Sequence, residues 1–108
     1  MIFLSYSWHD ALYTHQFAQK LLSTKTKVWL DIWNLNLNYS IQEQLEKAIQ
    51  ETSTFTLIDS LYSRQSKWVK LELSIAKKTN TPIEIIPYYT IYKYAMFNKE
   101  IIKISKEK

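Results

Sequence analysis

A tryptophan and a glutamate stand one helical turn apart in a segment with a clear helical pattern. At about 100° per residue, the lysines of the segment 68–78 fall on one arc, whereas Trp68 and Glu72 fall on the opposite, apolar arc. The side chains one turn from Glu72 are apolar, so its carboxylate has no basic partner on its own helix. A carboxylate in this position is desolvated, paired across the core or directed into a cleft.

The types of these two side chains define the chemistry that they can perform. The face of Trp68 can stack on a nicotinamide or adenine ring, and Glu72 can bind a ribose diol or stabilise a sugar cation. Ordinary glycosides need two carboxylates, because the leaving oxygen must be protonated. A nicotinamide leaving group is cationic and departs neutral, so one carboxylate suffices. A second interpretation stays open, in which Glu72 is tied to a loop amide or to Arg64 and Trp68 is ordinary core.

Short apolar runs that predict strands alternate with helical periods along the chain. This alternation is typical of an open parallel sheet covered by helices on both faces, so we predict an α/β, doubly wound fold of about five strands in one domain over residues 1–108. The chain stops just after the fifth predicted strand, so we expect a fragment or a minimal version without the closing helix. The predicted strands are Ile2–Leu4, Val28–Leu30, Phe55–Ile58, Ile83–Ile86 and Ile101–Ile104.

The helices between these strands begin at recognisable capping residues. Asp10 is predicted to cap a helix with an apolar face that includes Phe17. Ser40 and Glu43 have the spacing of a capping box, followed by a second amphipathic helix. The third helix covers residues 68–78.

The remaining connections are predicted to be irregular. Residues 59–66 form a polar loop, and residues 88–97 are aromatic and show no regular pattern. The segment 32–39 is predicted to be a loop in which asparagines take the left-handed conformations that glycine usually supplies. These asparagines are Asn34, Asn36 and Asn38.

The composition excludes several classes of protein. The 108 residues contain no cysteine, which excludes a disulfide scaffold, a thiolate nucleophile and a cysteine-based zinc site. They contain no glycine, which excludes the Walker A loop and the G-x-G-x-x-G fingerprint. The net charge of +4 does not argue for nucleic acid, and no segment reaches the roughly 18 apolar residues that span a bilayer. The first seven residues, Met-Ile-Phe-Leu-Ser-Tyr-Ser, lack a basic flank and are typical of a strand and not of a signal peptide, so we predict a cytoplasmic protein without a membrane partner or direct nucleic-acid binding. His9 and His15 lack partners at metal-ligand spacing, so no metal is expected.

In a doubly wound sheet, ligands bind outside the carboxyl ends of the strands. The third helix, which carries Trp68 and Glu72, begins at this edge of the predicted sheet. Other side chains expected at the same edge are Tyr6, Ser7, Trp8, Asp31, Trp33, Asp59, Ser60, Ser63 and Tyr88.

Five motifs over residues 1–88 resemble, in order and spacing, the Toll/interleukin receptor-type (TIR) domain family. The resemblance implies a flavodoxin-like sheet of five strands, in agreement with the strand pattern. The motifs are Ile-Phe-Leu-Ser-Tyr-Ser at 2–7, Val-Trp-Leu-Asp-Ile-Trp at 28–33, Ser-Ile at 40–41, the W-x-x-x-E segment Ser-Lys-Trp-Val-Lys-Leu-Glu-Leu at 66–73, and Ile-Pro at 86–87.

The resemblance also implies an activity. Bacterial TIR domains commonly cleave NAD into nicotinamide and ADP-ribose or a cyclised isomer, in immune-type signalling such as antiviral defence. NAD is then the substrate, and no cofactor is expected. By position, Glu72 matches the catalytic glutamate and Trp68 the tryptophan beside it. The implied substrate-binding residues are Tyr6, Ser7, Trp8, Asp31, Trp33, Tyr39 and Trp68.

Residues 31–40 are similar to the loop that closes over the pocket of TIR domains and mediates contacts between them. Leu35, Leu37 and Asn38 are the expected interaction residues, and Asn38 stands where this loop usually has glycine. Many TIR domains act only when assembled, because the loop of one copy completes the pocket of the next. Self-association with other TIR domains is therefore expected here.

Other functions remain to be weighed against NAD cleavage. The main alternative is a non-catalytic interaction module in signal transduction, supported by the apolar residues Trp33, Leu35 and Leu37. A phosphorylation receiver would use Asp59, but no acidic pair follows the first strand to hold Mg²⁺. A nucleoside deoxyribosyltransferase-like enzyme would use Glu72 as its nucleophile, but the spacing to Trp68 favours the TIR interpretation.

Overall fold

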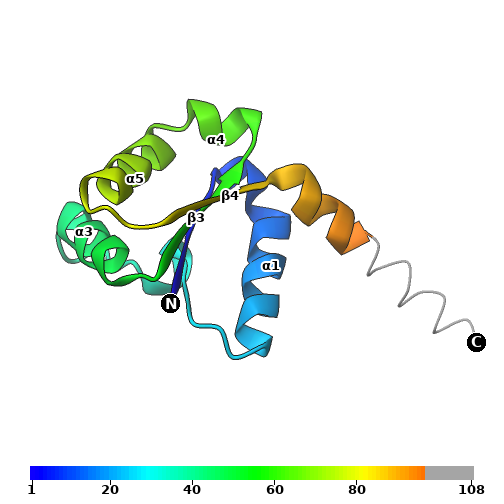
Figure 1. Ribbon diagram of the computed structural model, residues 1–108, viewed down its shortest axis with the longest axis horizontal. Coiled ribbons are helices and arrows are strands. Elements are labelled where there is room, and N and C mark those ends of the chain that lie inside the picture. Colours follow the sequence, from blue (N-terminus) through cyan, green and yellow to red (C-terminus); the bar gives the residue numbers. More distant parts are fainter. Residues whose placement is uncertain (97–108) are drawn as a thin grey trace, which may run out of the picture.

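The computed structural model describes residues 1–96 as a parallel sheet between two layers of helices (Figure 1). The strand order is β2-β1-β3-β4, and every neighbouring pair is parallel. This confirms the predicted α/β class. The fifth strand predicted at Ile101–Ile104 lies outside the described residues. The strands are β1 (Ile2–Ser5), β2 (Val28–Trp29), β3 (Thr54–Asp59) and β4 (Ile83–Pro87).

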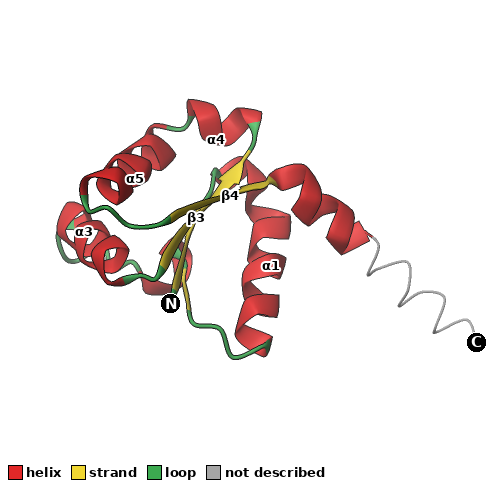
Figure 2. Cartoon of the chain, in the orientation of Figure 1, coloured by secondary structure: helices red, strands yellow, loops and turns green. Residues whose placement is uncertain are grey.

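The helices lie on both faces of this sheet (Figure 2). One face is covered by α3 and α5, and the other by α1 and by a helical segment over residues 88–96. No helix within residues 1–96 combines the length and the apolar character needed to cross a membrane. The helices are η1 (Trp8–Asp10), α1 (Ala11–Ser23), α2 (Asp31–Asn34), α3 (Ile41–Glu51), α4 (Leu61–Gln65) and α5 (Lys67–Lys78).

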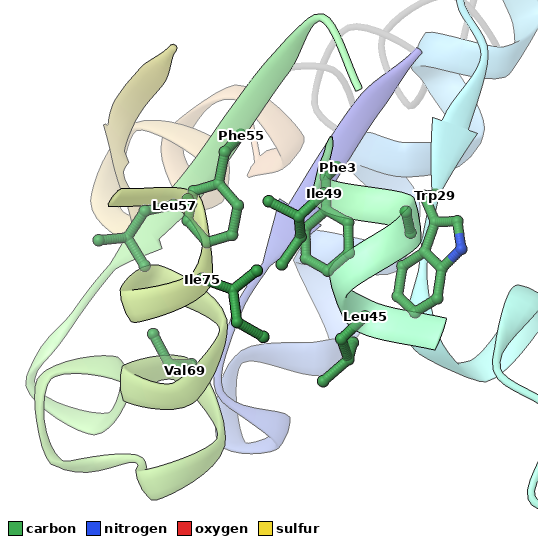
Figure 3. Packing of buried hydrophobic residues seen from close by; sticks show 10 residues of the cluster. Phe3, Trp29, Leu45, Ile49, Phe55, Leu57, Val69 and Ile75 are labelled. Carbon is green, nitrogen blue, oxygen red and sulfur yellow. The ribbon is translucent and has the colours of Figure 1, made fainter. Parts of the chain in front are cut away.

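Three stacked rings form the centre of the core on the α3/α5 face (Figure 3). The Phe3 ring lies 4.6 Å from that of Trp29 and 5.4 Å from that of Phe55, measured between centroids. These residues are partners in strand register, so the stack crosses three neighbouring strands. Ile49 from α3 and Ile75 from α5 pack against it. This packing fixes where α5, and therefore Glu72, lies over the sheet.

The segment 88–97 was predicted to be irregular, and this prediction is wrong for residues 88–96, which are helical. Ile91 is buried in the second core, on the α1 face. The Tyr13 ring of α1 contacts the rings of Tyr88 and Tyr92, at 6.3 and 5.3 Å between centroids. Ile91 and Tyr92 follow Tyr88 by three and four residues, so the three side chains lie on one face of the helix. The alternation of tyrosines with lysines conceals this face in the sequence.

Two of the connections predicted as loops contain short helices. In the segment 59–66, Ser60 and Ser63 cap α4 reciprocally, each side chain accepting a hydrogen bond from the other's backbone N–H. The segment 32–39 begins within α2. Both helices are short enough that no hydrophobic periodicity reveals them.

The hydrogen bonds correct one predicted helix cap and confirm another. Asp10 makes no side-chain capping bond to α1 and instead accepts a hydrogen bond from the Ser60 hydroxyl. Ser40 caps α3 as predicted, accepting from the Glu43 N–H.

The asparagines of the segment 32–39 do not take left-handed conformations. Within residues 1–96, positive φ angles occur instead at Lys25 (66°) and Asn80 (54°), in the turns after α1 and α5. Asn34 and Asn36 use their side-chain oxygens to accept from the N–H groups of Leu30 and Asn38. Side-chain hydrogen bonds therefore shape this connection without the backbone conformations that favour glycine.

Candidate active site

A pocket of about 440 Å³ lies at the carboxyl ends of β1 and β3. Four segments form its walls: the exit of β1, η1, α4 and the start of α5. Aromatic rings dominate, and those of His9 and Tyr62 stack at 4.5 Å between centroids. Such walls suit a planar ring. The lining residues are Tyr6, Ser7, Trp8, His9, Tyr62, Gln65, Ser66 and Trp68.

Beside this pocket, the Glu72 carboxyl group is buried in the core. Only 1% of Glu72 is exposed, because the residue lies on the buried, apolar face of α5. The Ser5 hydroxyl donates a hydrogen bond of 2.9 Å to Glu72 Oε1. Trp68, one turn earlier on α5, lines the pocket and packs against the core on the α3/α5 face. Glu72 itself is not among the lining residues.

The surroundings of Glu72 strongly disfavour its ionised form. Burial raises the pKa of the Glu72 carboxyl well above its ordinary value, and the charge of Asp31 raises this pKa further. Hydrogen bonds from Ser5 and Trp68 act in the opposite direction but do not cancel the effect of burial. A buried carboxyl group with this shift, next to a pocket, is a candidate for a functional group.

The interpretation that pairs Glu72 with Arg64 is wrong. Arg64 donates two hydrogen bonds to Asp59, of 2.9 Å from Nε and 2.7 Å from Nη2. Hydrogen bonding from Arg64 lowers the pKa of the Asp59 carboxyl. Within residues 1–96, this is the one ion pair between an acidic and a basic side chain. The hydrogen-bond partner of Glu72 is therefore the Ser5 hydroxyl and not the guanidinium of Arg64.

A second buried carboxylate, that of Asp31, accepts hydrogen bonds from two aromatic side chains near α1. Its Oδ1 atom accepts from the Tyr6 hydroxyl at 2.7 Å, and its Oδ2 atom accepts from Trp8 Nε1 at 2.9 Å. On its other side, the Tyr6 hydroxyl lies 2.8 Å from His15 Nε2. Burial and the hydrogen bond to Asp31 raise the pKa of Tyr6.

The end of β1 separates the two carboxylates. Ser5 contacts Glu72 of α5, whereas the next residue, Tyr6, lies in the core on the α1 face and contacts Asp31. Successive side chains of a strand point to opposite faces. The two carboxylates therefore have separate hydrogen-bond partners, and neither is among the residues that line the pocket.

The other predicted site residues divide into two groups. Tyr6, Ser7, Trp8 and Trp68 line the pocket, as their places along the sequence suggest. The remaining residues lie outside its lining, so a substrate-binding role for them stays a prediction. Leu35 packs against the core on the α3/α5 face. Four others are exposed: Trp33 to 41%, Tyr39 to 70% and Leu37 to 78%, with Asn38 also on the surface.

Sequence reasoning missed Ser5, His9 of η1 and the pocket residues that α4 contributes. The signal for Ser5 was a hydroxyl at the end of an otherwise apolar strand. Tyr62 and Gln65 belong to the segment 59–66, whose polar composition predicts a loop and gives no sign of the short helix α4. Within the described part of the chain, no group of three or more histidine, aspartate or glutamate side chains could hold a metal ion.

Comparisons with known proteins agree with the motifs. A sequence profile described as TIR domain matches residues 2–96. The TIR domain of the Toll-related receptor TRR-2 from Hydra magnipapillata has a similar structure, with a TM-score of 0.67, 17% identity, and coverage of 80% of this chain and 66% of that one. The TIR domains of the activated Roq1 resistosome, which directly recognizes the pathogen effector XopQ, are also similar. For them the TM-score is 0.71, the identity 19%, and the coverage 90% of this chain and 70% of that one.

The chain thus spans about two thirds of the length of these solved domains. At such low identity the structural similarity shows a shared fold. A search of curated proteins found no match.

Proposed function

This chain belongs to the TIR domain family, and on that premise we propose that it is an NAD-consuming enzyme that cleaves the bond between nicotinamide and ribose. The proposed setting is immune-type signalling of the bacterial kind, including antiviral defence, in the cytoplasm. The proposed substrate is NAD, and no cofactor takes part.

The observation that carries this proposal is the burial of Glu72 beside an aromatic pocket. A carboxyl group on the apolar face of α5 lowers the stability of the fold when it ionises, because its charge is not compensated by a cation. A purely structural position would be better filled by an apolar residue. Its neighbour Trp68 lines the pocket, so a modest local opening would bring a bound ribose next to the carboxylate.

In the proposed reaction, the bond between ribose C1′ and the pyridinium nitrogen breaks. Its electron pair goes to the nicotinamide, which leaves as a neutral molecule, and positive charge develops at C1′. The ionised Glu72 stabilises this charge. Water then attacks C1′ and loses a proton, which gives ADP-ribose; attack by an adenine nitrogen of the same molecule gives the cyclised isomer instead.

The buried state of Glu72 supports activation by self-association. In the isolated chain the Glu72 carboxyl group is 1% exposed, so it is not accessible, and burial raises its pKa, which disfavours the ionised form. Opening of the pocket would hydrate Glu72, lower its pKa and admit the ribose. The TIR domains of the Roq1 resistosome belong to an assembly and share this fold, which supports assembly as the trigger.

The direct test measures nicotinamide release from NAD by artificially clustered protein. The variants are Glu72→Gln, which removes the charge at nearly constant shape, and Glu51→Gln, which removes an exposed carboxylate of α3. We expect release by the wild type and by Glu51→Gln, and a loss of at least about 100-fold in Glu72→Gln. Full turnover by a folded, clustered Glu72→Gln variant would exclude this mechanism.

The second candidate is a non-catalytic self-association module. It is favoured by the exposed apolar side chains that follow β2, which include Trp33, Leu37 and Tyr39. This candidate predicts that the clustered wild type, shown to be folded, releases no nicotinamide. The same assay therefore separates the two functions.

A further inference from the structure

Trp8 reverses the usual placement of a tryptophan side chain. The residue is 71% exposed, yet its indole N–H is bonded to Asp31, a carboxylate that is only 6% exposed. Burial of apolar surface stabilises a fold by about 25 cal/mol per Å², so folding alone favours a buried ring. Trp8 instead keeps its apolar ring at the wall of the pocket and directs its polar atom into the protein.

The carboxylate that holds Trp8 is itself held in place. Asp31 Oδ1 accepts from the Tyr6 hydroxyl at 2.7 Å and from the Ile32 N–H at 2.8 Å. The Tyr6 hydroxyl is also within 2.8 Å of His15 Nε2 on α1. With Oδ1 engaged by two donors, the carboxylate cannot rotate freely, so Oδ2 has a defined position for the indole N–H of Trp8.

From this geometry we infer that Asp31 is a positioning residue, which fixes the indole of Trp8 at the pocket wall so that a planar ring can stack on it. Asp31 lies outside the pocket lining and accepts hydrogen bonds from Tyr6, Trp8 and Ile32, so the inferred role acts on the substrate through Trp8. The identification of the ring as the nicotinamide or adenine of NAD rests on the proposed function.

The same bond connects the pocket to the exposed segment after β2. Asp31 is the first residue of α2, and Trp33 and Leu37 follow it on the surface. One hydrogen bond therefore joins the indole of Trp8 to the start of the segment that carries these exposed apolar side chains.

The position of Trp8 can be tested without any activity, from the indole N–H signals in ¹H–¹⁵N NMR spectra. The chain has four tryptophans, and Trp8→Phe identifies the signal of Trp8. We expect this signal to lie downfield and to exchange slowly with water, although the ring is exposed. In Asp31→Asn the oxygen that remains serves Tyr6 and Ile32, so the Trp8 signal should move upfield and exchange faster. Asp59→Asn, at the same sheet edge but bonded to Arg64, should leave it unchanged.

The consequence for binding is tested with carba-NAD, a non-hydrolysable NAD analogue, on clustered protein. We expect Trp8→Phe and Asp31→Asn each to weaken binding about tenfold, which is the scale of one hydrogen bond to a charged group. The double variant should bind about as weakly as Trp8→Phe alone, because both changes remove the same interaction. With NAD itself, Asp31→Asn should raise KM and leave kcat within about twofold.

Several results would overturn the inference. They are rapid exchange of the Trp8 N–H in the wild type, a Trp8 signal that Asp31→Asn leaves in place, or additive losses in the double variant. If Asp31→Asn fails to fold, the exchange rate in the wild type decides the question alone. If the wild type does not bind carba-NAD while the Trp8 signal behaves as expected, the NAD proposal fails and the positioning role of Asp31 stands.

Discussion

The Ser5 hydroxyl donates a hydrogen bond of 2.9 Å to Glu72 Oε1 and so joins the end of β1 to the middle of α5. Both residues are buried. A hydroxyl is a weak substitute for a cation, because it satisfies one oxygen of the carboxylate without neutralising its charge. The pKa of Glu72 therefore stays well above its ordinary value despite this bond.

Replacing Glu72 by glutamine should stabilise the fold at neutral pH. The amide oxygen of glutamine can still accept from Ser5, and no charge needs to be buried. We expect the free energy of unfolding to rise by on the order of 1 kcal/mol. Denaturant unfolding at pH 7.5, with Glu51→Gln as the matched control, measures this gain. A clear loss of stability would show that the ionised carboxylate is well compensated in the core.

The stability of the wild type should fall as the pH rises above the ordinary carboxyl value of 4.5. Above that value, the folded chain keeps a proton on Glu72 that the unfolded chain has lost, so increasing pH favours unfolding until the raised pKa is passed. The difference in unfolding free energy between the wild type and Glu72→Gln isolates this contribution. It should become more unfavourable to the wild type with increasing pH, and a constant difference would contradict the raised pKa.

Removing the Ser5 hydroxyl should destabilise the fold, in contrast to Glu72→Gln. In Ser5→Ala the Glu72 Oε1 atom loses its donor while it remains buried, which should cost about 1–3 kcal/mol. The pKa of Glu72 should rise further, because the bond from Ser5 lowers it. Ser74→Ala on the exposed side of α5 is the control and should change stability by less than about 0.5 kcal/mol. Equal effects of the two substitutions would indicate that the Ser5–Glu72 bond contributes little.

The aromatic stack should be the most sensitive part of the core. Phe3→Ala removes the ring between Trp29 and Phe55 and should cost about 3–5 kcal/mol in unfolding free energy. Thermal and denaturant unfolding measure the loss. A cost below about 1 kcal/mol would mean that the surrounding side chains refill the space.

The exposed Leu37 should influence self-association and not folding. Its side chain is 78% exposed, so Leu37→Asp should leave the unfolding free energy within about 0.5 kcal/mol of the wild type. We expect this variant to weaken self-association by at least about tenfold, measured by sedimentation velocity. Leu22→Asp, on the exposed side of α1, is the control and should associate like the wild type. Equal association of both variants with the wild type would exclude the segment after β2 as the contact surface.

The sequence alone determined features that depend on neighbours along the chain. The apolar runs place the strands, and Ser40 marks the start of α3 through a bond to Glu43. The lack of a basic neighbour one turn from Glu72 can be read directly from its helix. Hydrophobic periodicity and capping act over three or four residues, so they are legible before the chain folds.

Which polar groups meet depends on how the helices pack on the sheet. Ser5 and Glu72 are separated by 67 positions, Asp10 and Ser60 by 50, and Tyr6 and Asp31 by 25. Several donors in the sequence could pair with each of these buried acceptors, and the packing of the helices on the sheet selects one. The same packing brings α4 to the pocket and places Asp31 within hydrogen-bond distance of Trp8. The distance between Asp31 and each candidate donor is set by the core and not by the spacing of residues along the chain.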